Sequence, residues 1–288
     1  MFLIINDRNP RKFVETPYVT WAIIAVCVLI FIWQSGLPTI EENNLINTYG
    51  LVPKDLQAFE VSAIVGLFSS LFLHAGFWHL AGNMWFLNTF GDNVEDAMGH
   101  AKFIVFYLAG GIAAGVAHYL SANGSSIPLV GASGAISAVV GAYFLLHPRA
   151  RVRVLILVFP IYLSARILIG LWFAFQLLSA FSDSSSAGGV AFWAHVGGFL
   201  AGMVVVKFFI RPEAKLWPSK DEDEDLQSWL EYKGLKKKKP EVVRAQGPWR
   251  KEPDAVIIEE GQDPWVIPKP DPRERRKPRS MLPENPRK

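Results

Sequence analysis

Long apolar stretches, separated by short polar segments, run from residue 17 to residue 210 of this chain. A helix that crosses a bilayer needs about 20 predominantly apolar residues. Six stretches approach this length: 17–35, 76–91, 102–121, 131–147, 165–182 and 190–210. The pattern therefore predicts an all-α membrane protein built as a six-transmembrane-helix bundle.

Two segments beside these stretches are ambiguous. The apolar stretch 61–73 ends at His74, so it predicts either a seventh span or a re-entrant segment. Residues 152–181 are too long for one straight span, and Pro160 lies within them. We therefore expect residues 150–164 to lie at the membrane interface, with the helix beginning after them.

Positive charge decides between six and seven spans, because Lys and Arg collect in cytoplasmic loops. Basic groups precede the first stretch, follow the fourth and follow the sixth: Arg8, Arg11 and Lys12; Arg149, Arg151 and Arg153; Arg211, Lys215 and 236–239. Six spans put all of these groups on one side and leave only Lys54 on the other. We therefore expect an integral multi-pass protein of the plasma (inner) membrane, with cytoplasmic N- and C-termini.

Composition divides the chain into a cytoplasmic N-terminus (1–16), a membrane domain (17–210) and a tail (211–288). The tail carries 19 of the 29 Lys and Arg, 16 of the 26 Asp and Glu, and 12 of the 19 prolines. Low hydrophobicity with high charge density predicts that this tail is mostly disordered. Charges balance in the rest of the chain, so the net charge of +3 gives no indication of a nucleic-acid partner.

Two polar residues inside the apolar stretches carry the candidate chemistry. Ser133 lies in the run Gly131-Ala-Ser-Gly134, and His195 lies in the run Ala194-His-Val-Gly-Gly198. Polar side chains are expensive in lipid, so they usually face a protein interior or a wet cavity. A histidine within hydrogen-bond reach can take the proton of a serine hydroxyl. We predict that Ser133 is the nucleophile and His195 the base of a hydrolase that works inside the bilayer.

Small residues on both helix faces would let the two predicted helices approach closely. Ser137 and Gly141 share the face of the serine, and Gly198 and Gly202 share the face of the histidine. Stripes of small residues favour close packing of membrane helices. No acidic residue lies in a span near the pair, so we expect a Ser–His dyad without an orienting carboxylate.

A third polar group lies in the second stretch. His79 and Asn83 are four residues apart and share a helical face. Both can donate hydrogen bonds to a developing oxyanion, which is the role we assign to them. His74, five residues before His79, is expected to fix a loop through buried hydrogen bonds. With six spans, all of these polar residues fall near the outer face of the membrane.

The order and spacing of these residues resemble the rhomboid intramembrane serine proteases. The resemblance rests on His74-x4-His79-x3-Asn83, Gly131-x-Ser133-Gly134 and Ala194-His195-x-Gly197-Gly198-x3-Gly202, on spans two, four and six. It covers roughly residues 17–210. It implies a six-helix bundle with a water-filled cavity open to the outside, and a first outer loop, about 36–73, that lies partly in the membrane.

The resemblance also implies roles and partners. Ser133 would be the nucleophile of a serine endopeptidase and His195 its general base, with no metal or cofactor. His79, Asn83 and the Ser133 backbone amide would form the oxyanion hole. The substrates would be single-span transmembrane proteins in the lipid bilayer, and neither their identity nor the oligomeric state of the protease follows from the sequence. Some members place a tyrosine against the histidine ring at the position of Ser137, so the support of the ring is in question here.

Two other interpretations stay open at this point. A polytopic membrane carrier or metal-binding protein could use the outer histidines, His74, His79 and His195, because three imidazoles are an acceptable zinc set. A catalytically inactive relative could bind membrane clients without cleaving them. The presence of both a serine and a histidine argues against the inactive relative.

Overall fold

The computed structural model describes residues 2–218, except 8, 10, 59, 123, 157–158 and 183–190, together with 242–243 and 256–257. The chain divides into two units, Met1–Lys233 and Gly234–Lys288. In the second unit, the short strands β4 (Val242–Val243) and β5 (Val256–Ile257) pair antiparallel. Most of the tail predicted to be disordered, 211–288, lies outside the described residues. The boundaries predicted after residues 16 and 210 stay predictions.

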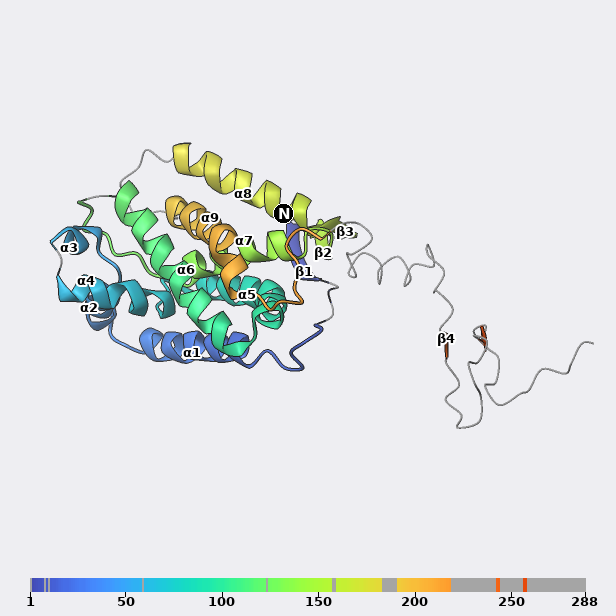
Figure 1. Cartoon of the computed structure of the whole chain (residues 1–288). Helices are drawn as coiled ribbons and strands as arrows, with labels where there is room; N and C mark the ends of the chain where they lie inside the picture. Colours follow the sequence, from blue (N-terminus) through green and yellow to red (C-terminus); the bar gives the residue numbers. More distant parts are fainter. Residues whose placement is uncertain are drawn as a thin grey trace, which may run out of the picture. The chain divides into compact units, whose positions relative to one another are not determined.

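The first unit is mostly helical (Figure 1). Four helices are long and apolar enough to cross a membrane: α1 (Tyr18–Ser35), α6 (His100–Ser121), α8 (Ala165–Ser182) and α9 (Phe192–Phe209). A fifth candidate is a bent pair, in which Val61–Phe72 and α5 (Phe77–Met98) meet at 76°. The described residues therefore contain four candidate spans, or five if the bent pair is one span.

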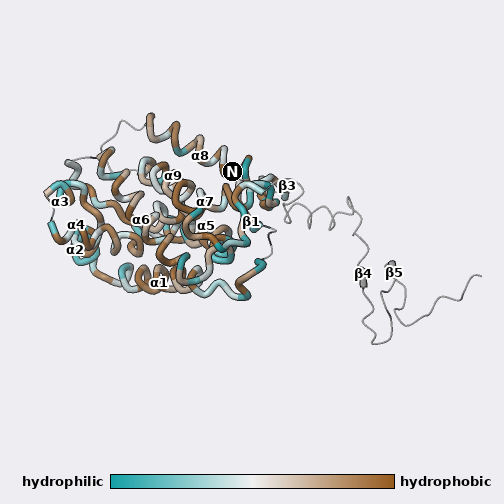
Figure 2. Tube along the Cα trace, viewed as in Figure 1, coloured by the Kyte–Doolittle hydropathy of each residue, from teal (hydrophilic) through white to brown (hydrophobic). Residues whose placement is uncertain are grey.

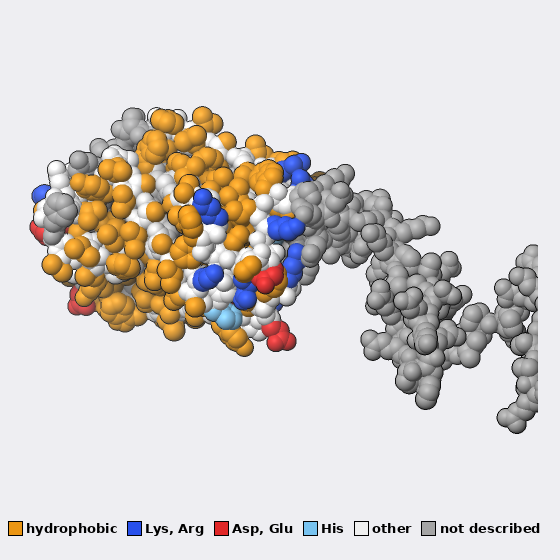
Figure 3. All heavy atoms as spheres, in the orientation of Figure 1, with side chains coloured by type: hydrophobic (Ala, Val, Ile, Leu, Met, Phe, Trp, Pro, Cys, Tyr) orange, Lys and Arg blue, Asp and Glu red, His pale blue; other side chains and the backbone are white. Residues whose placement is uncertain are grey.

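Apolar residues lie along all of these helices (Figure 2), and many of their side chains face outward. Figure 3 shows that hydrophobic side chains cover most of the visible surface of the helical part. Leu29, Leu171, Phe181 and Phe208 are examples of large apolar side chains that are exposed. A monomeric soluble protein rarely exposes so much contiguous apolar surface, whereas a bilayer would cover it. The mostly helical, multi-pass membrane character predicted from the sequence is thus confirmed.

The fourth predicted span, 131–147, is a helix of only 14 residues, α7 (Ser133–Leu146). At 1.5 Å per residue it is about 21 Å long, against a hydrocarbon core of about 30 Å. Helices α5, α6 and α9 pack around it, and every residue from Gly134 to Tyr143 is buried. A helix enclosed by protein does not need to match the bilayer thickness. The count of six spans therefore stays a prediction.

Helices α7 and α9 touch at their backbones. A Cβ atom on Gly202 would collide with the backbone of Ala138, and one on Gly198 would collide with the carbonyl oxygen of Gly134. A Cβ atom on Gly141 would meet the backbone of Phe199 in the same way. The predicted close contact between the helices that carry the serine and the histidine is confirmed.

A three-stranded antiparallel sheet, which the sequence analysis did not predict, makes the fold mostly rather than wholly helical. Its order is β1 (Phe2–Asp7), β2 (Arg151–Ile156), β3 (Phe159–Ser164). In β2 the arginines alternate with Val152 and Val154, which are buried. This period of two is the signal of a half-buried strand. The expectation that residues 150–164 lie at the membrane interface rested on the length of the apolar stretch and on Pro160, and it overlooked this alternation.

The segment between α1 and α5 is also structured. It contains α2 (Thr39–Tyr49), α3 (Pro53–Gln57), α4 (Val61–Ser69) and a turn of 3₁₀-helix, η1 (Ser70–Phe72). Leu51 and Leu129 exchange backbone hydrogen bonds of 3.0 and 2.8 Å. This bridge joins the segment to the residues that lead into α7.

A buried carboxylate joins the N-terminal end of α1 to the C-terminal part of α5. Glu95, fully buried near the end of α5, accepts hydrogen bonds from the backbone N–H groups of Val19 and Thr20 and from the Thr20 hydroxyl. Charge-assisted hydrogen bonds of this kind are stronger than neutral ones. They fix α1 against α5, the helix that carries His79 and Asn83.

Candidate active site

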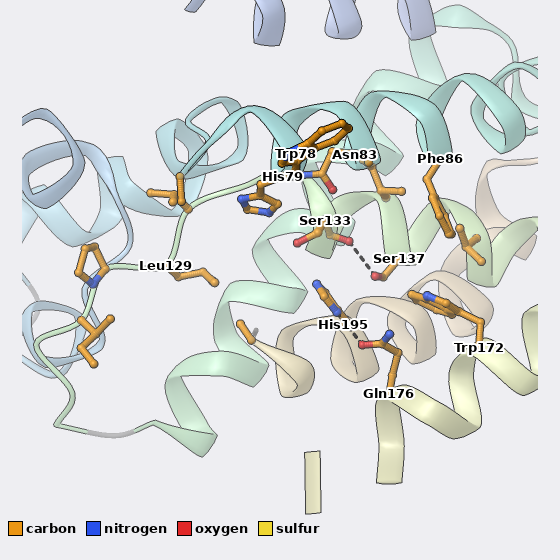
Figure 4. Close-up of a pocket in the computed structure, with 18 residues that line it drawn as sticks. Trp78, His79, Asn83, Phe86, Leu129, Ser133, Ser137, Trp172, Gln176 and His195 are labelled. Carbon is orange, nitrogen blue, oxygen red and sulfur yellow. Dashed lines mark hydrogen bonds between the residues drawn. The ribbon is translucent and has the colours of Figure 1, made fainter. Parts of the chain in front are cut away.

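A cavity of about 790 Å³ lies between α5, α7, α8 and α9. Figure 4 shows the polar side chains that reach it from these four helices: His79, Asn83, Ser133, Ser137, Gln176 and His195. The rest of the lining is mainly apolar and includes Phe86 and Trp172. A largely apolar pocket with a few convergent polar groups is the usual form of a ligand or active site.

Ser133 is the first residue of α7. Gly131, two residues earlier, has a φ of +124°, a backbone conformation that side chains rarely adopt. Its N–H donates a 2.8 Å hydrogen bond to the carbonyl of Ser70. This turn delivers Ser133 to the cavity at a helix N-terminus, where backbone N–H groups have no partner within the helix and the dipole favours negative charge.

His195 lies in the first turn of α9 and its ring points toward Ser133 in the cavity (Figure 4). The Nδ1 atom of the ring lies 2.8 Å from Oε1 of Gln176, a residue of α8. The indole of Trp172, one turn earlier in α8, has its centroid 6.4 Å from the ring centroid of His195. The structure therefore brings the predicted nucleophile and base into one cavity, with their side chains facing each other.

His79 and Asn83, both on α5, face Ser133 from the other side (Figure 4). Within the described part of the chain, the buried Nδ2 atom of Asn83 has no hydrogen-bond partner. A buried amide donor without a partner costs free energy, and such exceptions often mark functional groups. The two side chains thus lie across the cavity from Ser133, and the Asn83 amide has a donor available there.

His74 lies behind His79 and does not line the cavity. It is fully buried, and its ring makes an edge contact with that of His79, with centroids 5.3 Å apart. The buried side chain of Gln34 holds its backbone: Nε2 donates to the His74 carbonyl at 2.7 Å, and Oε1 accepts from the His74 N–H at 3.4 Å. The contact of His74 with the site is through the ring of His79.

The sequence analysis missed Gln176, although a signal for it was present. It is a polar residue in an apolar stretch, the criterion by which the serine and the histidine were found, and only 6% of it is exposed. Single glutamines are common in proteins. The group that usually orients a catalytic histidine is a carboxylate, so an amide does not stand out in the sequence. Only the packing of α8 beside α9 shows that this amide reaches the histidine.

The histidines are not arranged to bind a metal ion. Among the described residues, no group of three or more His, Cys, Asp or Glu side chains could hold one. His74 contacts His79, but it turns its ring into the protein interior and not into the cavity that His195 lines. The geometry therefore gives no support to a cation carrier that uses these three histidines.

The helices and the cavity define a class of protein, a multi-pass helical membrane protein with a serine and a histidine facing each other in a largely apolar cavity. Residues 62–212, about half of the chain, match the family described as the Rhomboid domain. The chain therefore belongs to the rhomboid family.

Several rhomboids of known name are similar to the chain. Rhomboid protein 1, mitochondrial, of Saccharomyces cerevisiae is 27% identical over 80% of this chain and 58% of its own length. The human presenilin-associated rhomboid-like protein, mitochondrial, is 29% identical over 48% of this chain and 36% of its own. RHOMBOID-like protein 1 of Arabidopsis thaliana is 27% identical over 66% and 47%. The chain thus spans 58% of the length of the yeast relative and less than half of the length of the other two.

The predicted plasma (inner) membrane location, with cytoplasmic termini, is wrong by this comparison. The names of the yeast and human relatives place those proteins in mitochondria. The physical reason for the error is that the distribution of Lys and Arg indicates which loops share a side of a membrane. It carries no information about which membrane of the cell that is. The multi-pass character is unaffected.

Gly131 lies close to the ring of His79, and a first testable prediction follows from this contact. A Cβ atom at this position would lie 2.6 Å from Cε1 of His79, so we expect Gly131→Ala to displace that ring while the fold is retained. Cleavage of a transmembrane substrate should fall about 100-fold, the cost of losing one oxyanion donor. Gly124→Ala is the matched control, because Gly124 also has a positive φ (+81°) but has open space around it. Equal activity of the two variants would contradict the prediction.

Proposed function

We propose that the protein is an intramembrane serine endopeptidase that cleaves the transmembrane segments of membrane-protein substrates. The observation that carries this proposal is that Ser133 and His195, which are far apart in the sequence, lie in one cavity. The His79 imidazole and the Asn83 amide lie on the opposite side of Ser133 (Figure 4). Membership of the rhomboid family supports it. The mitochondrial relatives further support a mitochondrial membrane as the place of action.

In the proposed reaction, Oγ of Ser133 attacks the carbonyl carbon of the scissile peptide bond while Nε2 of His195 takes its proton. Negative charge develops on the carbonyl oxygen, where His79, Asn83 and the Ser133 N–H can donate to it. His195 then gives the proton to the departing amine, and the C–N bond breaks. Water, activated by the same imidazole, hydrolyses the acyl-enzyme and frees Ser133.

The cavity also supports a particular class of substrate. The carbonyls of a transmembrane helix are engaged in its own hydrogen bonds and are not open to attack. The polar side chains in the cavity offer alternative hydrogen-bond partners to a segment that unwinds. We propose that the substrates are single-span proteins with weak helix formers, such as Gly, near the cut.

The alternative of a polytopic carrier or metal-binding protein differs in its response to metal removal. The test uses the full chain in liposomes with a single-span reporter that has a Gly-rich segment near one end of its helix. We expect cleavage at the same rate with and without EDTA, because the proposed reaction uses no metal. Cleavage that EDTA abolishes would favour metal chemistry. A chain that leaves every tested reporter intact would point to a carrier or an inactive relative.

A further inference from the structure

We propose that Gln176 is a positioning residue, which holds His195 in the tautomer that carries its proton on Nδ1. The inference rests on the proposed protease function, because a base needs a free nitrogen to take the proton of Ser133. The amide sits on α8, a helix to which neither the serine nor the oxyanion donors belong. It would replace the orienting carboxylate that the sequence lacks.

The geometry of the pair fixes the direction of the hydrogen bond. Oε1 of Gln176 lies 2.8 Å from Nδ1 of His195. A carbonyl oxygen can only accept, so Nδ1 must be the donor. A neutral imidazole has one N–H, so the lone pair is then on Nε2, on the edge of the ring that points toward Ser133 (Figure 4). The hydrogen bond thus selects the one neutral form that can act as a base toward the serine.

Burial makes this contact stronger than it would be in water. Gln176 is buried, and its contact to the ring lies in a cavity with mainly apolar walls. Breaking the bond would leave a buried polar group without a partner, which costs more than the bond itself contributes. A neutral amide also avoids the large cost of burying a carboxylate. None of the described residues that line the cavity is acidic.

The same face of α8 supports the ring in a second way. Trp172, four residues before Gln176, has its ring 6.4 Å from that of His195 and inclined by 31°. Trp172 also lies 6.2 Å from Phe86 of α5, so its own position is fixed from the far wall. The hydroxyl of Ser137 donates to the Ser133 carbonyl at 2.7 Å. The orientation of the base is therefore controlled from α8.

The kinetic test compares three variants of the full chain in liposomes with the single-span reporter. Gln176→Leu keeps the size of the side chain but removes the acceptor, and we expect kcat to fall about 10-fold or more with KM nearly unchanged. Gln176→Glu keeps an acceptor for Nδ1–H but buries a carboxyl group, so it should retain clearly more activity than Gln176→Leu and less than the wild type. Leu178→Ala, an exposed residue of the same helix, is the control and should match the wild type. A Gln176→Leu variant with wild-type kcat would overturn the inference.

The spectroscopic test does not depend on cleavage. Nitrogen NMR of the chain with isotope-labelled histidine distinguishes Nδ1–H from Nε2–H, and the His195 signals are those lost in His195→Gln. We expect Nδ1–H at neutral pH in the wild type and a mixture of tautomers in Gln176→Leu. An Nε2–H form in the wild type would overturn the inference. A wild type that shows Nδ1–H but cleaves nothing would count against the proposed function alone.

Discussion

Replacing Ser133 with alanine should reduce cleavage of a transmembrane reporter by about 10⁴-fold or more, to the background of the assay. Loss of the nucleophile removes the covalent route entirely, and single removals in serine proteases have effects of this order. The fold should be unaffected, because the substitution removes one oxygen atom at the cavity wall and alanine is a good helix former. Thermal unfolding in detergent provides the check on folding.

A matched control for this variant is Ser137→Ala, which removes a hydroxyl one turn further along the same helix. The Ser137 hydroxyl donates a hydrogen bond of 2.7 Å to the carbonyl of Ser133. A single hydrogen bond of this kind contributes little net free energy, so we expect at most a modest loss of activity. If Ser133→Ala still cleaved at a substantial fraction of the wild-type rate, another group would have to be the nucleophile.

The second large effect is expected from Gly202→Val, at a residue of α9 that does not line the cavity. A Cβ atom here would overlap the backbone of Ala138, and no side-chain rotation can relieve a clash with backbone. Forcing α9 away from α7 should cost about 3 kcal/mol of stability, as overpacking of a tight core does. It should also abolish cleavage, because the same contact holds His195 against Ser133.

Gly170→Val is the control for this effect. Gly170 lies on α8, and a Cβ atom there would meet nothing within 4 Å. Melting temperature and cleavage should both stay close to those of the wild type. A Gly202→Val variant that unfolds and cleaves like Gly170→Val would show that contact between α7 and α9 is not required.

Local patterns were enough to predict the long apolar helices and to single out Ser133 and His195, which the structure places in one cavity. The apolar stretches at 17–35, 102–121, 165–182 and 190–210 correspond closely to α1, α6, α8 and α9. Stripes of small residues predicted that the helices with Ser133 and His195 touch, because backbones approach closely only where side chains are small. Both signals are contained in the spacing of residues along one helix, which is why a single sequence carries them.

Features that leave no pattern of small or apolar residues along a single helix were not predicted. The pairing of Phe2–Asp7 with Arg151–Ile156 joins the two ends of a 150-residue segment, and no local pattern specifies it. The shortness of α7 was not predicted, because its apolar composition does not reveal that the helices around it, and not lipid, cover most of its surface. Gln176 was passed over because its partner lies 19 residues away, on the next helix.

Labelling with a fluorophosphonate tests the pairing of Ser133 and His195 most directly, because the reagent reacts with an activated serine and needs no substrate. The full chain in liposomes is treated with the reagent, and mass spectrometry locates the adduct. We predict modification of Ser133 in the wild type, and a rate that falls at least about 100-fold in His195→Ala, the scale on which a general base contributes. An adduct on another residue, or undiminished labelling of Ser133 in His195→Ala, would contradict the account.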